Sequence, residues 1–457
     1  MLFAQHVPFG PLAQIGPISY SAPSAILPFT SAQAPAPPLA GVRDQMILSQ
    51  RAVMGGLLLL AACSNAATLT VGKSTGPCPN SSYSTIGAAL STAASGDIIE
   101  ICPGLYPEQL TITKSVKLRG IGAGGYGRVL LQPAAITNVQ NPLQSGTSFQ
   151  AAISVINTTD VEIKDLAIDA SLNSASGCTV SLAAIHFSNS SGTVANNAIS
   201  GAQLSDPTTC TTLFPGNGFG VLVDTTTGQS GPFDVAITGN SIHQFNRNGI
   251  LVNGAGISAT ISDNTISGIG PSTGYNQFGV FIALGAVANI SHNLINQANC
   301  GSIDLTTCMN LRSEGIVFRA AGDGSVADSN IITNVQSGIF LNGATHAQVS
   351  NNVIMSVDAL DGIDIQGTAS GVFTGSIISG NKISHVFPIS GQRCGIFEAP
   401  NTGVSRNLIF ENRVDDAYCG VAFVSADNNF SNVYSNTLYT ELNIDQYPNG
   451  LPQPTEP

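Results

Sequence analysis

The chain has 457 residues, of which 43% are hydrophobic and only 9% are charged, and it contains 49 glycines. This composition is typical of short strands joined by many turns and argues against long helices. The formal net charge of −12, with only 15 lysines and arginines, argues against nucleic acid as a partner, because neutralising phosphates requires a basic stripe. The same charge would repel an acidic polysaccharide unless a divalent cation bridged the two.

The first 63 residues predict export. Residues 1–45 are rich in proline and alanine without periodicity, which indicates a disordered or untranslated upstream segment. In residues 46–63, Arg51 precedes a ten-residue apolar stretch, Val53 to Ala62, that is too short to span a bilayer as a helix. This pattern is typical of a secretory signal, so we expect a secreted or cell-envelope protein.

The end of this stretch, Leu60-Ala61-Ala62-Cys63, resembles the lipobox of bacterial lipoproteins. The resemblance implies cleavage before Cys63 and lipidation of that cysteine, which would anchor the protein to a membrane through lipid alone. The alternative is an ordinary signal with an incidental cysteine.

Residues 64–125 are expected to form an N-terminal cap and the first coils of the fold. Ile86, Ala89, Leu90 and Ala93 share one face of a predicted helix. That face would lie over the open end of the first coil and cover its core, which prevents end-to-end stacking.

From about residue 150, a glycine followed by a short apolar strand alternates with an asparagine followed by another. The first half appears as "FGVFI", "EGIVF" and "SGIFL", the second as "HNLI", "SNII" and "NNVI", and glycines 315, 338 and 362 lie 23 and 24 residues apart. A unit this short must stack on copies of itself to bury its apolar face. We therefore predict an all-β fold, a right-handed parallel β-helix over residues 126–440 with a tail at 441–457.

The recurring asparagines have a structural interpretation. Asparagine tolerates left-handed backbone at a bend, and stacked copies can form a ladder of amide hydrogen bonds inside the turn. We therefore assign them to the fold and not to a site.

Eight cysteines remain beside Cys63, and an even number in an exported chain predicts disulfides. Thiolate metal sites are the alternative, but no CxxC spacing supports one. We predict pairing in sequence order: Cys78 with Cys102, Cys178 with Cys210, Cys300 with Cys308, and Cys394 with Cys419.

The segment after the predicted helix contains Gly96-Asp97-Ile98, Pro103-Gly104, Tyr106 and Glu108. This pattern resembles the opening of pectin-lyase-like β-helix proteins. The resemblance implies the β-helix fold and, through members that act on glycans, a polysaccharide partner. The motifs that mark the esterases, polygalacturonases and pectate lyases of this superfamily are absent, so no particular activity follows.

Aligning the coils on the glycine places candidate residues in rows. The position two after each glycine should point outward, and it is apolar in most coils, with Asp364 as an exception. Such a row indicates either a binding groove or a face covered by another part of the chain. Its aromatic members, Phe281, Phe340 and Phe397, are candidate substrate-binding residues, and the polar row Asn342 and Gln366 lies beside them.

Acids near the glycines are the catalytic candidates. Glu314 and Asp361 should lie two coils and roughly 10 Å apart, close to the carboxyl spacing of inverting glycosidases. By the resemblance to lyases of the fold, Asp361 and Asp364 could bind calcium while Arg319, the one base on the aligned strands, removes a proton.

Glu398 falls in an inward row. Either Pro400 twists the strand so that Glu398 reaches solvent, or Glu398 is buried with a raised pKa and is a functional candidate. The exposed alternative is favoured because buried acids are rare.

These observations predict an extracytoplasmic monomer that binds a polysaccharide. They leave open whether it also cleaves the polysaccharide, in which case it would be a lyase or a glycoside hydrolase. The competing interpretation is a non-catalytic surface scaffold or adhesin-like lipoprotein. No cofactor is certain, and calcium is the one suggested.

Overall fold

The computed structural model describes residues 66–73, 78–122, 128–137, 139–140, 148–173, 180–204, 218–226, 228–229, 231–271, 275–299, 313–357, 360–367, 375–386, 393–399, 406–423, 431–440 and 442–446. They fall within one compact unit, residues 64–457. Among them, no helix is both long and apolar enough to cross a membrane.

Almost every described element is a short strand, and the strands form three parallel sheets that we call A, B and C. Sheet A contains, in stacking order, Thr68–Val71 (β1), Ile98–Ile101 (β2), Lys117–Gly120 (β5), Val161–Lys164 (β9), Gly192–Ala195 (β12), Phe233–Thr238 (β15), Ile257–Ser262 (β18), Val287–Ser291 (β21), Val326–Asp328 (β24), Gln348–Ser350 (β27), Ile377–Ser379 (β30), Leu408–Phe410 (β33) and Asn432–Tyr434 (β36).

Sheet B contains Gly104–Tyr106 (β3), Val129–Leu131 (β6), Ala167–Asp169 (β10), Ala198–Ser200 (β13), Ser241–His243 (β16), Thr265–Ser267 (β19), Leu294–Asn296 (β22), Ile331–Val335 (β25), Val353–Val357 (β28), Lys382–Val386 (β31), Arg413–Asp415 (β34) and Thr437–Tyr439 (β37).

Sheet C contains Leu110–Ile112 (β4), Ser148–Ile156 (β8), Val180–Ser188 (β11), Gly218–Asp224 (β14), Asn248–Asn253 (β17), Phe278–Ala283 (β20), Glu314–Arg319 (β23), Ser337–Asn342 (β26), Ile363–Gln366 (β29), Cys394–Ala399 (β32), Cys419–Phe423 (β35) and Leu442–Gln446 (β38). Val139–Gln140 (β7) pairs antiparallel with β8.

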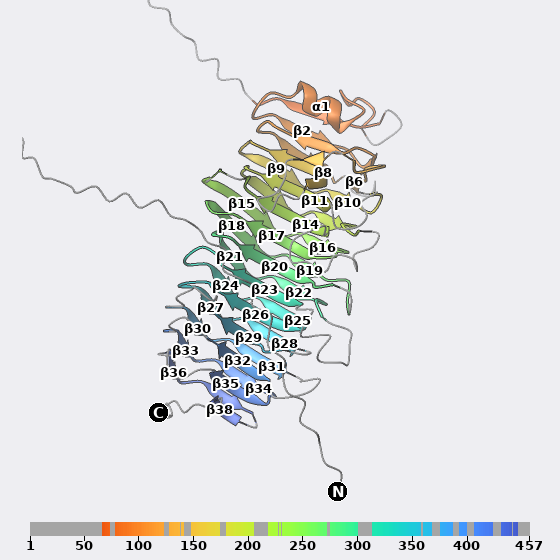
Figure 1. Cartoon of the computed structure of the whole chain (residues 1–457). Helices are drawn as coiled ribbons and strands as arrows, with labels where there is room; N and C mark the ends of the chain where they lie inside the picture. The colour runs from red at the N-terminus through yellow and green to blue at the C-terminus, as the bar shows by residue number, and fades with distance from the viewer. Residues whose placement is uncertain are drawn as a thin grey trace, which may run out of the picture. The chain divides into compact units, whose positions relative to one another are not determined.

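The chain visits sheets C, A and B in turn, and each strand pairs with the strand one coil further on, which is the architecture of a right-handed parallel β-helix (Figure 1). One apolar cluster fills its interior from Val71 to Phe423. The predicted fold class is thus confirmed.

The helix Ile86–Thr92 (α1) caps the first coil (Figure 1). Ile86 and Ala89 are fully buried against the core, and Leu90 packs against it, as predicted. Both carboxylate oxygens of Glu108 accept from the first backbone N–H groups of the helix, those of Ile86 and Gly87, at 2.8 Å. At the other end, the Lys114 ammonium donates to three C-terminal carbonyls, so opposite charges satisfy the two ends of the helix dipole.

The recurring glycine is explained by close approach between coils. A Cβ at Gly315 would lie 2.5 Å from Cγ2 of Ile332 and 2.7 Å from the carbonyl oxygen of Gly338. Because neither atom can move without disturbing the core, only glycine fits at this corner between sheets B and C.

The asparagines form the predicted ladder at the corner between sheets A and B. Asn352 is typical: its Oδ1 accepts from the backbone N–H and the Nδ2 of Asn330, while its Nδ2 donates to Asn381 and to the carbonyl of Ala327. The members are Asn197, Asn240, Asn264, Asn293, Asn330, Asn352, Asn381, Asn412 and Asn436.

One detail of the prediction was wrong, because positive φ falls on the residue before each of these asparagines. That residue is Asn196, Gly239, Asp263, His292, Ser329, Asn351, Gly380, Glu411 or Ser435. The left-handed residue turns the chain, and its side chain type varies, whereas the following asparagine supplies the hydrogen bonds.

Two of the predicted disulfides are confirmed, Cys78–Cys102 and Cys394–Cys419. The second joins partners in register on β32 and β35. The other two predicted pairs, and Cys63, lie outside the described residues.

Candidate functional site

Most of the predicted catalytic and substrate-binding residues lie along the outer face of sheet C. Along each strand, side chains alternate between the interior and this face, so Val280 and Ile282 join the core while Phe281 does not. The row predicted from the glycine alignment runs in register through Phe281, Val317, Phe340, Asp364 and Phe397.

Most of this row is buried. The exposed fraction is 8% for Phe281, 5% for Phe340 and 1% for Asp364, and Phe397 is partly buried. Since an outer face can be buried only beneath other chain, the structure favours the covered face over the open groove.

The carboxylates before the glycines also share a row. Glu314 is the register partner of Ser337, whose hydroxyl donates to the carbonyl of Asp361 on the next coil, at 3.1 Å. Glu314 and Asp361 are therefore two coils, roughly 10 Å, apart along the backbone. Both side chains are buried, with exposed fractions of 1% and 3%.

An arginine absent from the sequence prediction accompanies Glu314. The Arg247 guanidinium is buried and lies 5.0 Å from the ring centroid of Phe278, the register partner of Glu314. Burial lowers the pKa of Arg247 to about 10; the negative charge of Glu314 opposes this shift and the positive charge of Arg319 adds to it. Arg247 therefore remains a cation at neutral pH. The glycine alignment missed it because it precedes the strand.

Protein donors partly engage the two candidate calcium ligands. Asp361 Oδ1 accepts from the backbone N–H of Cys394 at 2.8 Å, and its Oδ2 lies 3.9 Å from Arg393. Asp364 Oδ2 accepts from Gln366 at 2.9 Å. The described residues contain no group of three or more His, Cys, Asp or Glu side chains suited to a metal ion, so a calcium site would need further ligands beside Asp361 and Asp364.

The polar row is the accessible edge of the face. Arg319, Asn342 and Gln366 are consecutive register partners, and all three are half-buried. Together with Phe397, these are the predicted site residues that are partly exposed to solvent.

Glu398 is separate from this face, and the prediction that it reaches solvent was wrong. It stands in register between Ile365 and Phe423, inside the helix, with an exposed fraction of 1%. Burial raises its pKa to about 7, although the Ser431 hydroxyl donates to its Oε1 at 2.9 Å. The strand keeps its register to the end, so no twist frees the side chain.

The outer face of sheet C holds a second polar group that the glycine alignment missed. Nε2 of His186 lies 2.9 Å from Oδ1 of Asp224, both side chains are buried, and the imidazole packs against Phe149 with ring centroids 4.8 Å apart. Ser154 is the register partner of His186 on the preceding coil. The glycine alignment began at Gly220, after the strands that carry Ser154 and His186, and therefore did not reach them.

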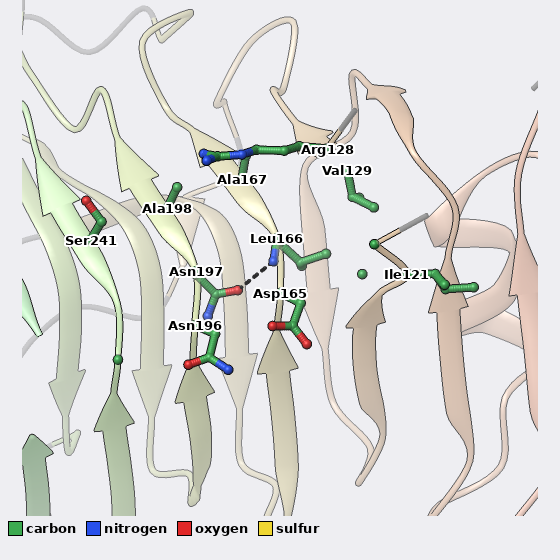
Figure 2. A pocket seen from close by; sticks show the side chains of 13 residues that line it. Ile121, Arg128, Val129, Asp165, Leu166, Ala167, Asn196, Asn197, Ala198 and Ser241 are labelled. Atoms are coloured by element: carbon green, nitrogen blue, oxygen red, sulfur yellow. Dashed lines mark hydrogen bonds between the residues drawn. The ribbon is translucent and has the colours of Figure 1, made fainter. Parts of the chain in front are cut away.

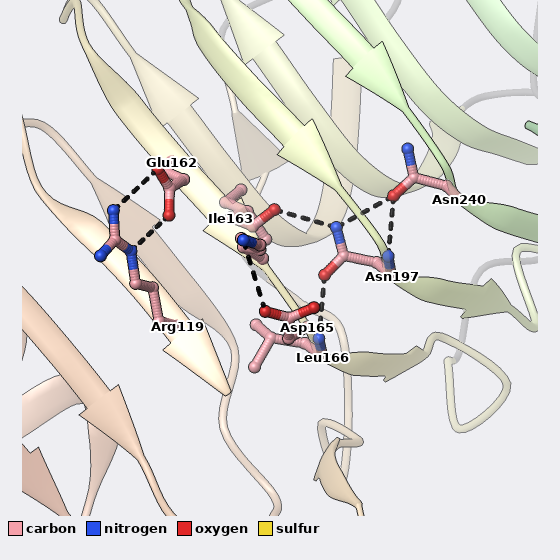
Figure 3. Close-up of polar contacts among 8 residues, drawn as sticks. Arg119, Glu162, Ile163, Asp165, Leu166, Asn197 and Asn240 are labelled. Atoms are coloured by element: carbon pink, nitrogen blue, oxygen red, sulfur yellow. Dashed lines mark hydrogen bonds and ion pairs between the residues drawn. The ribbon is translucent and has the colours of Figure 1, made fainter. Parts of the chain in front are cut away.

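A cavity of about 550 Å³ lies elsewhere, at the corner between sheets A and B in the first coils (Figure 2). Its rim carries Arg128, Asp165, Asn196 and Ser241, all exposed, and its walls include Ile121 and further apolar side chains. Figure 3 shows the polar contacts beside it, where the Arg119 guanidinium pairs with Glu162 and the asparagine ladder begins.

Comparisons with known proteins agree with the fold. A family model described as "Right handed beta helix region" matches residues 219–397 and, overlapping, 314–441. No match was found among curated protein sequences.

Among solved structures, a native GH136 lacto-N-biosidase from Eubacterium ramulus superposes with a TM-score of 0.52 at 9% identity, covering 82% of this chain and 68% of that one. The A-module of the Azotobacter vinelandii mannuronan C-5 epimerase AlgE4 gives a TM-score of 0.48 at 12% identity, with coverages of 81% and 93%. An exopolygalacturonase from Thermotoga maritima gives 0.45 at 9% identity, with coverages of 78% and 83%. At these identities the likeness concerns the fold.

Proposed function

We propose that this β-helix binds a polysaccharide along the outer face of sheet C, with the sugar chain crossing several coils. The observation that carries the proposal is the mixture of charged and aromatic side chains on that face. Glu314 and Arg319 lie on β23, between the strands of Phe281 and Phe340, and Arg247 lies over the ring of Phe278. A face that needed only to be covered would be apolar, because burying charged groups costs free energy. Phenyl rings and hydrogen-bonding groups together suit the apolar faces and hydroxyl edges of sugars.

We propose hydrolysis as the reaction of this face, with Glu314 and Asp361 as acid and base. Their separation of two coils is close to the upper end of the range for inverting glycosidases, in which a water molecule lies between the carboxyls and the sugar. The lyase alternative asks Arg319 to accept a proton, and arginine retains its proton in proteins. A carboxylate is therefore the better base on this face.

The proposal includes export from the cytoplasm. Cys78–Cys102 and Cys394–Cys419 support it, since structural disulfides persist in oxidising compartments. Lipidation of Cys63 and the domain boundaries at 45, 63, 125 and 440 remain predictions. Mass spectrometry of the N-terminal peptide from expressing cells would test the lipid anchor.

The test uses the oxidised chain from Ser64, incubated with polygalacturonate, alginate, xylan and a neutral β-glucan, each with and without calcium. New reducing ends without unsaturated products are expected for at least one glycan. Glu314→Gln and Asp361→Asn should lower the rate at least 100-fold, and Glu411→Gln, an exposed acid at the other corner, should leave it unchanged. Unsaturated products that require calcium would contradict hydrolysis and make this a lyase.

The burial of the face favours a second candidate, a non-catalytic scaffold. If the folded protein neither cleaves nor binds any glycan in the panel, the outer face of sheet C serves only to hold its cover. Affinity electrophoresis in gels cast with each glycan measures binding independently of cleavage.

A further inference from the structure

The cavity at the corner between sheets A and B lies where the second coil departs from the repeat. The coils before and after it pass from sheet A to sheet B through two residues, as between β2 and β3 or between β12 and β13, whereas eight residues separate β5 from β6. At the next coil Leu166 takes the place of a ladder asparagine, and its backbone N–H donates to Asn197 Oδ1 at 3.0 Å. The ladder therefore begins one coil later, and the corner is hollow where it is absent (Figure 2).

The acids beside this cavity already have cationic neighbours. Arg119 donates to both carboxylate oxygens of Glu162, and the hydrogen bond lowers the pKa of that carboxyl. Lys164 Nζ lies 3.8 Å from Asp165 Oδ2 (Figure 3). Each pair is neutral, so neither acid leaves a net negative charge at the rim.

Arg128 is a charged side chain at the cavity rim that pairs with no opposite charge among the described residues. Its guanidinium reaches over Ala167 toward the strand of Ala198 (Figure 2), and it forms no hydrogen bond or ion pair with any described residue. The chain carries a net charge of −12, yet no carboxylate among the described residues pairs with Arg128. Its positive charge is therefore available to an anionic ligand. The guanidinium fork matches the two oxygens of a carboxylate.

We propose that this cavity binds a carboxylate-bearing sugar, such as a single uronic acid unit. Arg128 holds the carboxylate, Asp165 and Asn196 accept from and donate to the ring hydroxyls, and Ile121 contacts the apolar face of the ring. The volume of about 550 Å³ lies within the range of small-ligand sites. This site is independent of the proposed function of sheet C.

The experiment compares galacturonate with galactose, which differ only in the carboxylate at C6, by titration calorimetry on the oxidised chain from Ser64 at low salt. Galacturonate is expected to bind at least tenfold more tightly than galactose. Arg128→Gln should lose that preference, Arg128→Lys should retain part of it, and Ala198→Leu, which fills the opposite wall without changing charge, should weaken both sugars. Arg413→Gln, an exposed arginine remote from the cavity in sequence, is the matched control and should bind like the wild type.

Equal binding of galactose and galacturonate, or an unchanged preference in Arg128→Gln, would overturn the proposal. Sulfate is the third ligand. If it competes as well as galacturonate, the assignment to carboxylate sugars is wrong and the cavity is a general anion site. Circular dichroism of each variant establishes that a lost signal is not unfolding.

Discussion

The corner between sheets A and B and the outer face of sheet C are built from the same coils and differ in regularity. At the corner, asparagine recurs, and each copy donates a side-chain hydrogen bond to the next. Asn330 donates to Asn352, and Asn352 donates to Asn381. On the outer face, the row changes from Phe340 to Asp364 to Phe397 within three coils. Repetition in a solenoid therefore marks what the fold needs, and departures from it mark candidate function.

Breaking the ladder should have the largest effect. Asn352→Ala removes the acceptor of Asn330 and leaves the buried carbonyl of Ala327 without its donor, so we expect a loss of about 4 kcal/mol in the free energy of unfolding, since each unpaired buried group costs about 1 to 3 kcal/mol. Urea denaturation measures it. Asn351→Gly is the matched control. The exposed Asn351 side chain donates to Asp328, and glycine tolerates the positive φ of this position, so the loss should be about 1 kcal/mol or less. Equal losses would contradict the assignment.

Glu398 is a buried acid in an otherwise apolar row of the core, and its ionisation should make stability depend on pH. Because burial raises its pKa from 4.5 to about 7, the folded state retains a proton that the unfolded state releases. The stability associated with that proton is complete below about pH 4.5 and is lost as the pH rises to about 7, by at most about 3 kcal/mol. Glu398→Gln, which remains neutral, should flatten this part of the stability profile. An unchanged profile would show that Glu398 is not its source.

The glycine at the corner between sheets B and C should tolerate no side chain. Gly315→Ala is expected to lower the free energy of unfolding by about 2 kcal/mol, because the added Cβ would contact Ile332 and the backbone of Gly338. Gly122→Ala, whose Cβ would meet no atom within 4 Å, should be neutral. Thermal unfolding of the two variants gives the comparison directly, and a neutral Gly315→Ala would refute the steric explanation.

The smallest effect is expected at the cap. Glu108→Gln removes the charge that accepts from Ile86 and Gly87 at the start of α1, for a loss of about 1 kcal/mol. High salt should lower the stability of the wild type toward that of the variant, because it screens the interaction between Glu108 and the helix dipole. Hydrogen exchange of the α1 amides would report the change locally, and unaltered protection would contradict it.

The parts that repeat could be predicted from the sequence, because the physical cause of each repeat acts locally. The spacing of Gly315 and Gly338 and of the asparagines after them gives the coil, the core and the ladder. The apolar face of Ile86 and Ala89 gives the cap.

What could not be predicted depends on contacts between distant segments. The burial of Phe281 depends on its packing against Phe278, Val317 and Phe340 from neighbouring positions of sheet C. Arg247 and the His186–Asp224 pair come together only when coils stack, and the cavity beside Arg128 arises where the repeat is missing. Glu398 was placed correctly in an inward row, but its burial was rejected on the general rarity of buried acids.

The most direct test of the account is the retardation of Arg319→Gln in gels containing the polysaccharide that most retards the wild-type chain. Arg319 lies on the accessible edge of the outer face and is half-buried, and the unfolding midpoint of the variant establishes that it is folded. We predict at least a tenfold loss of affinity, with Arg413→Gln retarded like the wild type. Retardation of Arg319→Gln equal to that of the wild type would show that the glycan does not bind along sheet C.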